Sequence, residues 1–106
     1  MTSGARHLVE ILLPKNTGTG EPVGIDWFEA LLKELTEKFG GATSFVRSPG
    51  KGLWQSGGQT ESDTIAVIEV MAESVDPDYW GSLRKRLERE LSQEQIIIRA
   101  QETSLP

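Results

Sequence analysis

Short apolar runs alternate along the chain with polar, glycine-rich segments. Four of these runs are rich in aliphatic and β-branched residues, which is typical of strands. They are residues 7–13, 42–46, 64–72 and 95–100. The run at 64–72 shows little alternation between apolar and polar positions, which indicates a strand that is covered on both faces over part of its length.

Two further segments carry apolar residues at the spacing of an amphipathic helix. The first has Asp26 as its N-cap and Glu29 in the capping-box position, and Gly40 ends it, since glycine readily adopts the left-handed conformation. The second starts at Asp76, and Pro77 follows at the first helical position, where its missing N–H costs nothing. Their apolar positions are Phe28, Leu31, Leu32, Leu35 and Phe39 in the first helix, and Trp80, Leu83, Leu87 and Leu91 in the second.

The predicted order of elements is strand, helix, strand, strand, helix, strand. This order resembles the ferredoxin-like β-α-β-β-α-β plait, which implies an α+β fold with a four-stranded antiparallel sheet and two helices on one face. Residues 1–106 are expected to form one domain of this kind, with a long hairpin connection at about 47–62 and a loose C-terminal tail at about 101–106. Because the fold hosts many unrelated functions, it does not indicate one.

Two glutamates predict which sides of the central strands the helices leave uncovered. Side chains alternate along a strand, so Glu10 and Glu69 each mark the more polar set of their strand. These sets also include the apolar residues Leu8, Leu12, Ile65, Val67 and Met71. Two interpretations are open: loops and the tail cover this face, or a second copy of the chain packs on it as a homodimer. In the homodimer, Glu10 and Glu69 would need solvent at the rim of the interface or a basic partner such as Arg99, because a buried unpaired carboxylate is costly.

Composition narrows the classes of function. The chain has no cysteine, which excludes disulfides and thiolate chemistry, and only one histidine. Its net charge of −5 argues against broad binding to nucleic acid, because such binding needs a field of basic residues. Apart from His7, the predicted strands at 7–13 and 64–72 contain no aromatic residue to stack bases. No apolar run approaches the length of a membrane span, and residues 1–7 lack the basic segment followed by an apolar core that a signal peptide requires. We therefore expect a cytoplasmic protein without a membrane partner.

The single histidine, His7, is the only candidate general base with an ordinary pKa near neutrality. Its position at the start of a strand favours a solvent-accessible residue over a catalytic one. No Gly-x-Ser-x-Gly motif and no closely spaced set of metal ligands accompanies it. We therefore expect no metal and no cofactor, and name His7 as the catalytic candidate only if the protein is an enzyme.

Four glycines gather in the stretch SPGKGLWQSGG, residues 48–58. A phosphate-binding loop of the Walker type needs a lysine followed by serine or threonine at the start of a helix, but here Leu53 comes after Lys51-Gly52 and a strand follows. The stretch instead predicts a bent hairpin arm between two strands, with residues 53–55 extending the second strand. Arg47, Lys51 and Trp54 are the candidate binding residues on this arm.

Two hypotheses on function remain. In the first, the protein is a small non-catalytic interaction or regulatory module that dimerises through its sheet and presents the arm to a partner. In the second, it is a cofactor-independent enzyme or small-molecule binder that resembles dimeric α+β-barrel proteins, with His7, Arg47 and Trp54 near the site. A pocket that holds convergent polar groups would favour the second hypothesis.

Overall fold

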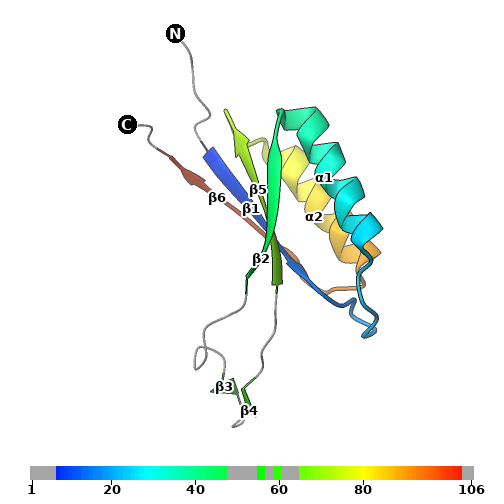
Figure 1. Cartoon of the computed structure of the whole chain (residues 1–106). Coiled ribbons are helices and arrows are strands. Elements are labelled where there is room, and N and C mark those ends of the chain that lie inside the picture. Colours follow the sequence, from blue (N-terminus) through cyan, green and yellow to red (C-terminus); the bar gives the residue numbers. More distant parts are fainter. Residues whose placement is uncertain (1–6, 48–54, 57–58, 61–64, 104–106) are drawn as a thin grey trace.

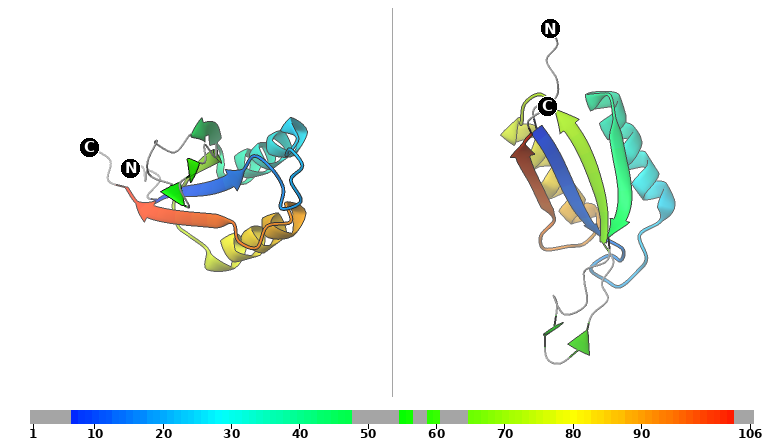
Figure 2. Two further views of the ribbon diagram at one scale, coloured as in Figure 1. Left: turned by 90° about the horizontal axis from the view of Figure 1, so that it is seen from below. Right: turned by 60° about the vertical axis from the view of Figure 1, so that its left-hand side comes forward.

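A computed structural model describes residues 7–47, 55–56, 59–60 and 65–103 of the protein. The main sheet has four antiparallel strands in the order β2-β5-β1-β6 (Figure 1). These strands are β1 (His7–Pro14), β2 (Ala42–Arg47), β5 (Ile65–Ala72) and β6 (Ile97–Glu102). The helices α1 (Ile25–Phe39) and α2 (Pro77–Glu90) lie side by side on one face of this sheet (Figure 2).

The fold class predicted from the sequence, a ferredoxin-like plait of four strands and two helices, has to be corrected. The described part of the chain has six strands in two sheets, because β3 (Gln55–Ser56) and β4 (Gln59–Thr60) pair only with each other. The expected extension of the second strand to Gln55 is wrong, since Gln55 pairs with Thr60 and not with the main sheet. The protein is therefore described as an α+β fold with a second, two-stranded sheet beyond one end of the main sheet (Figures 1 and 2).

The start of the first helix and both ends of the last strand differ from the prediction by up to two residues. Helix α1 begins at Ile25 with Gly24 as its N-cap and no side-chain cap, so the capping box at Asp26 is wrong. Asp26 lies instead in the first turn, where its negative charge still interacts favourably with the positive end of the helix dipole. Strand β6 runs from Ile97 to Glu102, so its start is later than predicted and its last two residues belong to the sheet rather than to a loose tail.

Both other helix-end predictions are confirmed. Gly40 has φ 87° and ends α1, and its N–H donates to the carbonyl of Thr36 at 2.8 Å. The side chain of Asp76 accepts a hydrogen bond from the N–H of Asp78 at the start of α2, at 3.0 Å, with Pro77 in the first turn. These two ends fix where each helix meets the sheet.

The core lies between the main sheet and the two helices. Its fully buried side chains come from alternate positions of β1 and β5 and from the facing stripes of α1 and α2, as the apolar pattern predicts. They include Val9, Ile11, Leu13, Ile68, Val70, Leu35 and Leu87. The sets that contain Glu10 and Glu69 therefore occupy the opposite face of the sheet, which neither helix covers.

The loop after β1 is fastened to the end of α2. The N–H of Gly18 donates to the carbonyl of Leu91 at 2.9 Å, and the side-chain amide of Gln93 donates to the carbonyl of Asn16 at 3.2 Å. A Cβ atom on Gly18 would lie 1.7 Å from the carbonyl oxygen of Ser92. Only glycine therefore fits where the two segments meet. Within the described ranges, no helix is long and apolar enough to cross a membrane.

Candidate functional site

A row of charged side chains crosses the helix-free face of the main sheet. Strand register places Glu10 of β1 directly opposite Glu69 of β5 on one side and Arg99 of β6 on the other. The Nε of Arg99 donates to Oε1 of Glu10 at 2.9 Å. Arg99 is the basic residue that the sequence analysis named, as an alternative to solvent, for a carboxylate in a homodimer interface, and it pairs with Glu10 within one chain.

The charges of these three side chains do not cancel one another. Glu10, Glu69 and Arg99 sum to −1, and carboxylates directly opposite each other on neighbouring strands repel. Glu10 is buried, with a side chain only 12% exposed, and Arg99 sits over it. Glu69 is half-buried and has no hydrogen bond or ion pair with any residue that the structure describes. Within the described part of the chain, Glu69 is therefore the carboxylate of the row that has no such partner.

Apolar side chains flank the charged row on both sides. Leu8 and Met71 are paired by register on one side, and Leu12 lies between Val67 and Ile97 on the other. Met71 is 40% exposed and Ile97 49% exposed, although both are large hydrophobic residues on a sheet face. A carboxylate between apolar rows suits a ligand that combines a positive charge with an apolar body.

His7 lies at the start of β1, at the far end of the sheet from Arg47. Its Nδ1 is 3.3 Å from the carbonyl oxygen of Glu73, and its Nε2 is 4.0 Å from a carboxylate oxygen of Glu102. The register pairs His7 with Ala72, the last residue of β5, whereas Arg47 is paired with Ile65, the first. The structure therefore does not bring these two candidate residues together.

The remaining residues proposed on the hairpin arm are placed only in part. Arg47 is the last residue of β2 and is described by its backbone alone. Lys51 and Trp54 lie outside the described residues. The arm as a binding element therefore stays a prediction.

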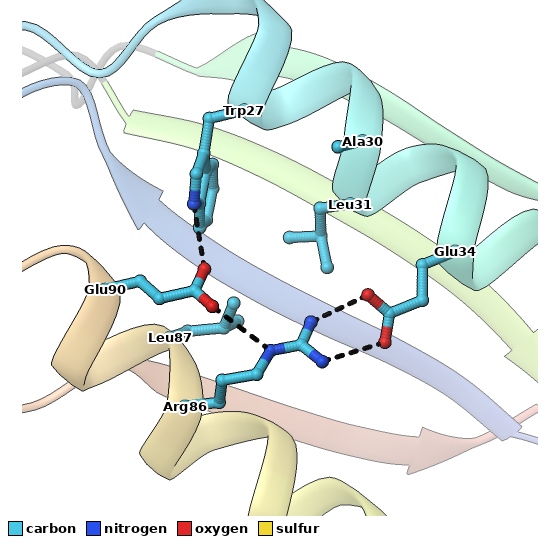
Figure 3. A pocket seen from close by; sticks show the side chains of 7 residues that line it. All are labelled: Trp27, Ala30, Leu31, Glu34, Arg86, Leu87 and Glu90. Carbon is cyan, nitrogen blue, oxygen red and sulfur yellow. Dashed lines mark hydrogen bonds and ion pairs between the residues drawn. The ribbon is translucent and has the colours of Figure 1, made fainter.

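A second polar cluster lines a groove of about 250 Å³ between α1 and α2. Arg86 makes two hydrogen bonds to the carboxylate of Glu34, at 2.7 and 3.1 Å. Its Nε lies 3.6 Å from Glu90, and the other oxygen of Glu90 accepts a hydrogen bond from the indole of Trp27 at 3.0 Å. Figure 3 shows these four side chains joined in one chain of contacts between the two helices.

Electrostatics couple this cluster to the only tyrosine of the chain. The pKa of Arg86 is raised above its ordinary value, mainly by its hydrogen bonds to Glu34. The pKa of Tyr79 is also raised, first by burial and then by the nearby charge of Glu34, while Arg86 opposes the shift. Lys38 lies over the ring of Tyr79, 4.6 Å from its centre. The cluster is thus a network of ion pairs and hydrogen bonds that links α1 to α2.

The helix groove is not among the sites expected from the sequence. The residue spacing in the sequence could have indicated part of it, because Trp27 and Glu34 are seven residues apart and therefore lie on the same side of α1. Arg86 and Glu90 are likewise four apart on α2. Which side of one helix faces which side of the other depends on how they pack, and spacing alone does not give that. Among the described residues, no three carboxylate or imidazole side chains are grouped so as to hold a metal ion.

Comparisons with known proteins identify the fold and no family. No family model matches the chain, and no curated protein matches it. Two solved structures are similar over nearly the whole chain. A phage SAM lyase in complex with S-methyl-5'-thioadenosine has a TM-score of 0.63 and 20% identity over 96% of this chain and 84% of that chain. A phage SAM lyase in its apo state has a TM-score of 0.58 and 17% identity over 96% and 86%. At this identity, the likeness establishes a shared α+β fold.

Proposed function

We propose that the protein binds S-adenosylmethionine on the helix-free face of its sheet and releases S-methyl-5'-thioadenosine from it. The observation that carries this proposal is the similarity of nearly the whole chain to two phage SAM lyase structures, one of them with S-methyl-5'-thioadenosine bound. This develops the enzyme or small-molecule alternative that the sequence leaves open. A cytoplasmic location belongs to the same proposal.

The chemistry of the ligand matches that of the sheet face. S-adenosylmethionine carries a positive sulfonium next to apolar methyl and methylene groups. The charged row offers a carboxylate, Glu69, between apolar side chains, with a net charge of −1 for the row. Arg99 covers Glu10 and leaves Glu69 as the partner for the cation.

The proposed reaction breaks the bond between sulfur and the methionine-derived carbon chain. Both electrons of the bond stay on sulfur, so the sulfonium becomes the neutral thioether. The carbon fragment completes its valence by accepting an internal nucleophile or by losing a neighbouring proton. Because positive charge leaves the sulfur in this step, a carboxylate that attracts the sulfonium stabilises the substrate more than the transition state. Glu69 is therefore assigned to substrate binding and to the release of the uncharged product.

The test is to incubate the purified protein with S-adenosylmethionine and to quantify S-methyl-5'-thioadenosine by liquid chromatography. We expect product that depends on enzyme concentration. The Glu69→Gln variant should raise KM by at least about fivefold, the factor for one unit charge about 4 Å away in bulk water, without lowering kcat. Glu94→Gln is the matched control, because it makes the same charge change at an exposed residue after α2.

Failure to release product above the spontaneous rate would reject the lyase activity. A Glu69→Gln variant that loses kcat at unchanged KM would retain the activity but reject the assigned role of this residue. Far-ultraviolet circular dichroism of each variant confirms that the fold is intact.

A second candidate function is self-association through the same face. It is favoured by Met71 and Ile97, which are 40% and 49% exposed beside the charged row. This candidate keeps the interaction module and homodimer expected from the sequence. Size-exclusion chromatography with light scattering tests it, since a monomer at all concentrations would reject it. Replacing Met71 and Ile97 by threonine should shift an oligomer toward monomer.

A further inference from the structure

Arg99 of β6 uses only part of its guanidinium within the protein. Its Nε donates to Oε1 of Glu10 at 2.9 Å, and this is the only hydrogen bond or ion pair of Arg99 within the ranges that the structure describes. The remaining N–H donors, on its two Nη atoms, have no partner there. The side chain of Arg99 is 54% exposed, whereas that of Glu10 beneath it is 12% exposed. Arg99 is therefore held at Nε, with donors left over for a ligand on the sheet face.

The unused donors suit a carboxylate. Parallel N–H groups of a guanidinium match the two oxygens of a carboxylate, and such charge-assisted hydrogen bonds are roughly twice as strong as neutral ones. S-adenosylmethionine carries one carboxylate, at the end of its amino-acid part. Arg99 thus has the chemistry to recognise a group of the proposed substrate that Glu69 would repel.

The charges of the row follow the same order as the opposite charges of this ligand. Strand register gives negative Glu69, negative Glu10 and positive Arg99 across β5, β1 and β6. Along its amino-acid part, S-adenosylmethionine carries a positive sulfonium, a positive α-ammonium and a negative α-carboxylate. With the sulfonium at Glu69, each charge of the ligand lies nearest to a charge of opposite sign. The reverse orientation would place the carboxylate beside Glu69.

The spacing of the strands fits the length of this part of the ligand. Neighbouring strands lie about 5 Å apart, so the backbones of Glu69 and Arg99, with β1 between them, are about 10 Å apart. The sulfur and the carboxylate carbon are joined through three carbon atoms and lie roughly 5 Å apart when extended. One contact of about 3 Å at each end gives a similar span. Both ends of the amino-acid part can therefore be bound at the same time.

We infer that Arg99 binds the α-carboxylate of S-adenosylmethionine and sets the orientation of the ligand on the sheet face. The inference rests on the proposed function and adds a specificity-determining residue to the same site. Glu10 holds the guanidinium in place at Nε. Because S-methyl-5'-thioadenosine has no carboxylate, Arg99 contributes to the binding of the substrate and not to that of the product.

The experiment is a calorimetric titration of the full-length protein with S-adenosylhomocysteine and with its decarboxylated form, S-adenosylthiopropylamine. The sulfur of both ligands is uncharged, so the proposed reaction does not consume them, and they differ only in the carboxylate. The wild-type protein should prefer S-adenosylhomocysteine. Arg99→Gln should reduce this preference by at least about fivefold, the factor for one unit charge about 4 Å away in bulk water. The affinity for S-methyl-5'-thioadenosine should be the same in both proteins.

Two further variants separate the carboxylate contact from a general effect of charge or folding. Arg89→Gln is the matched control, because it makes the same change at an exposed residue of α2, on the other side of the sheet, and it should leave the preference unchanged. Arg99→Lys keeps the charge but lacks the fork, so it should lower the preference less than Arg99→Gln does. Circular dichroism confirms the fold of each variant. If Arg99→Gln does not fold, the two ligands on the wild-type protein decide the question.

Two results would overturn the inference and leave the proposed function intact. The first is a wild-type protein that releases S-methyl-5'-thioadenosine from S-adenosylmethionine but binds the decarboxylated ligand at least as tightly as S-adenosylhomocysteine. The second is an equal preference in the wild-type protein and in folded Arg99→Gln. A protein that neither binds nor releases S-methyl-5'-thioadenosine would instead reject the proposed function, and the inference with it.

Discussion

Replacing Gly18 by alanine tests how the loop after β1 is fastened to α2. A Cβ atom at this position would lie 1.7 Å from the carbonyl oxygen and 2.9 Å from the carbonyl carbon of Ser92. Both are backbone atoms, so the clash is relieved only if the loop or the end of α2 moves. Such movement also breaks the 2.9 Å hydrogen bond from the Gly18 N–H to Leu91.

The expected cost combines two contributions. Overpacking typically costs about 1–3 kcal/mol. The lost hydrogen bond adds about 1 kcal/mol. Together they lower the free energy of unfolding by about 2–4 kcal/mol, which corresponds to a fall in Tm of at least about 8 °C for a domain of this size.

Urea denaturation followed by circular dichroism measures this change. Gly81→Ala is the matched control, because a Cβ there meets no atom within 4 Å and the residue lies inside α2. That control should stabilise the protein by up to about 1 kcal/mol, since alanine favours helix. A Gly18→Ala protein within about 0.5 kcal/mol of wild type would refute the close contact between the loop and Ser92.

Two further predictions concern the helices. Tyr79 is the only tyrosine, so the absorbance of tyrosinate at alkaline pH follows this residue alone. The pKa of Tyr79 should lie above the ordinary value of 10.0, and Glu34→Gln should lower the pKa of Tyr79, because the charge of Glu34 contributes to raising it. Because its folded-state pKa is raised, its contribution to stability is complete below pH 10 and is lost as pH rises through the folded-state pKa, which urea denaturation at several pH values measures. Asp76→Ala should lower the free energy of unfolding by about 1 kcal/mol by removing the N-cap of α2, and Asp78→Ala by less. Equal urea midpoints for these two variants would contradict the cap.

The positions of the helices and of the main-sheet strands followed from local patterns in the sequence. Alternation along β1 and β5 separated the core residues from the face with Glu10 and Glu69, because a strand sends successive side chains to opposite sides. The pairing of Glu10 with Arg99 was one of two alternatives that the sequence left open, the other being solvent, because a buried carboxylate needs a partner.

Other features depend on contacts between distant segments and could not be predicted in this way. Asp26 had the residue type of an N-cap, but the N-cap of α1 is Gly24, two residues earlier, and the helix begins at Ile25. The pairing of β3 with β4 was missed because a glycine-rich connection gives no register. The ion pair between Arg86 and Glu34 could be predicted only by knowing which faces of α1 and α2 pack together. None of these is set by the spacing within one element.

Isothermal titration calorimetry with S-adenosylmethionine and S-methyl-5'-thioadenosine tests the central claim most directly. The account predicts that the wild-type protein binds both, and that Glu69→Gln weakens only the charged S-adenosylmethionine, by at least about fivefold. Glu94→Gln should bind both as the wild type does. The absence of heat for either ligand at millimolar concentration, with a folded wild-type protein, would contradict the claim.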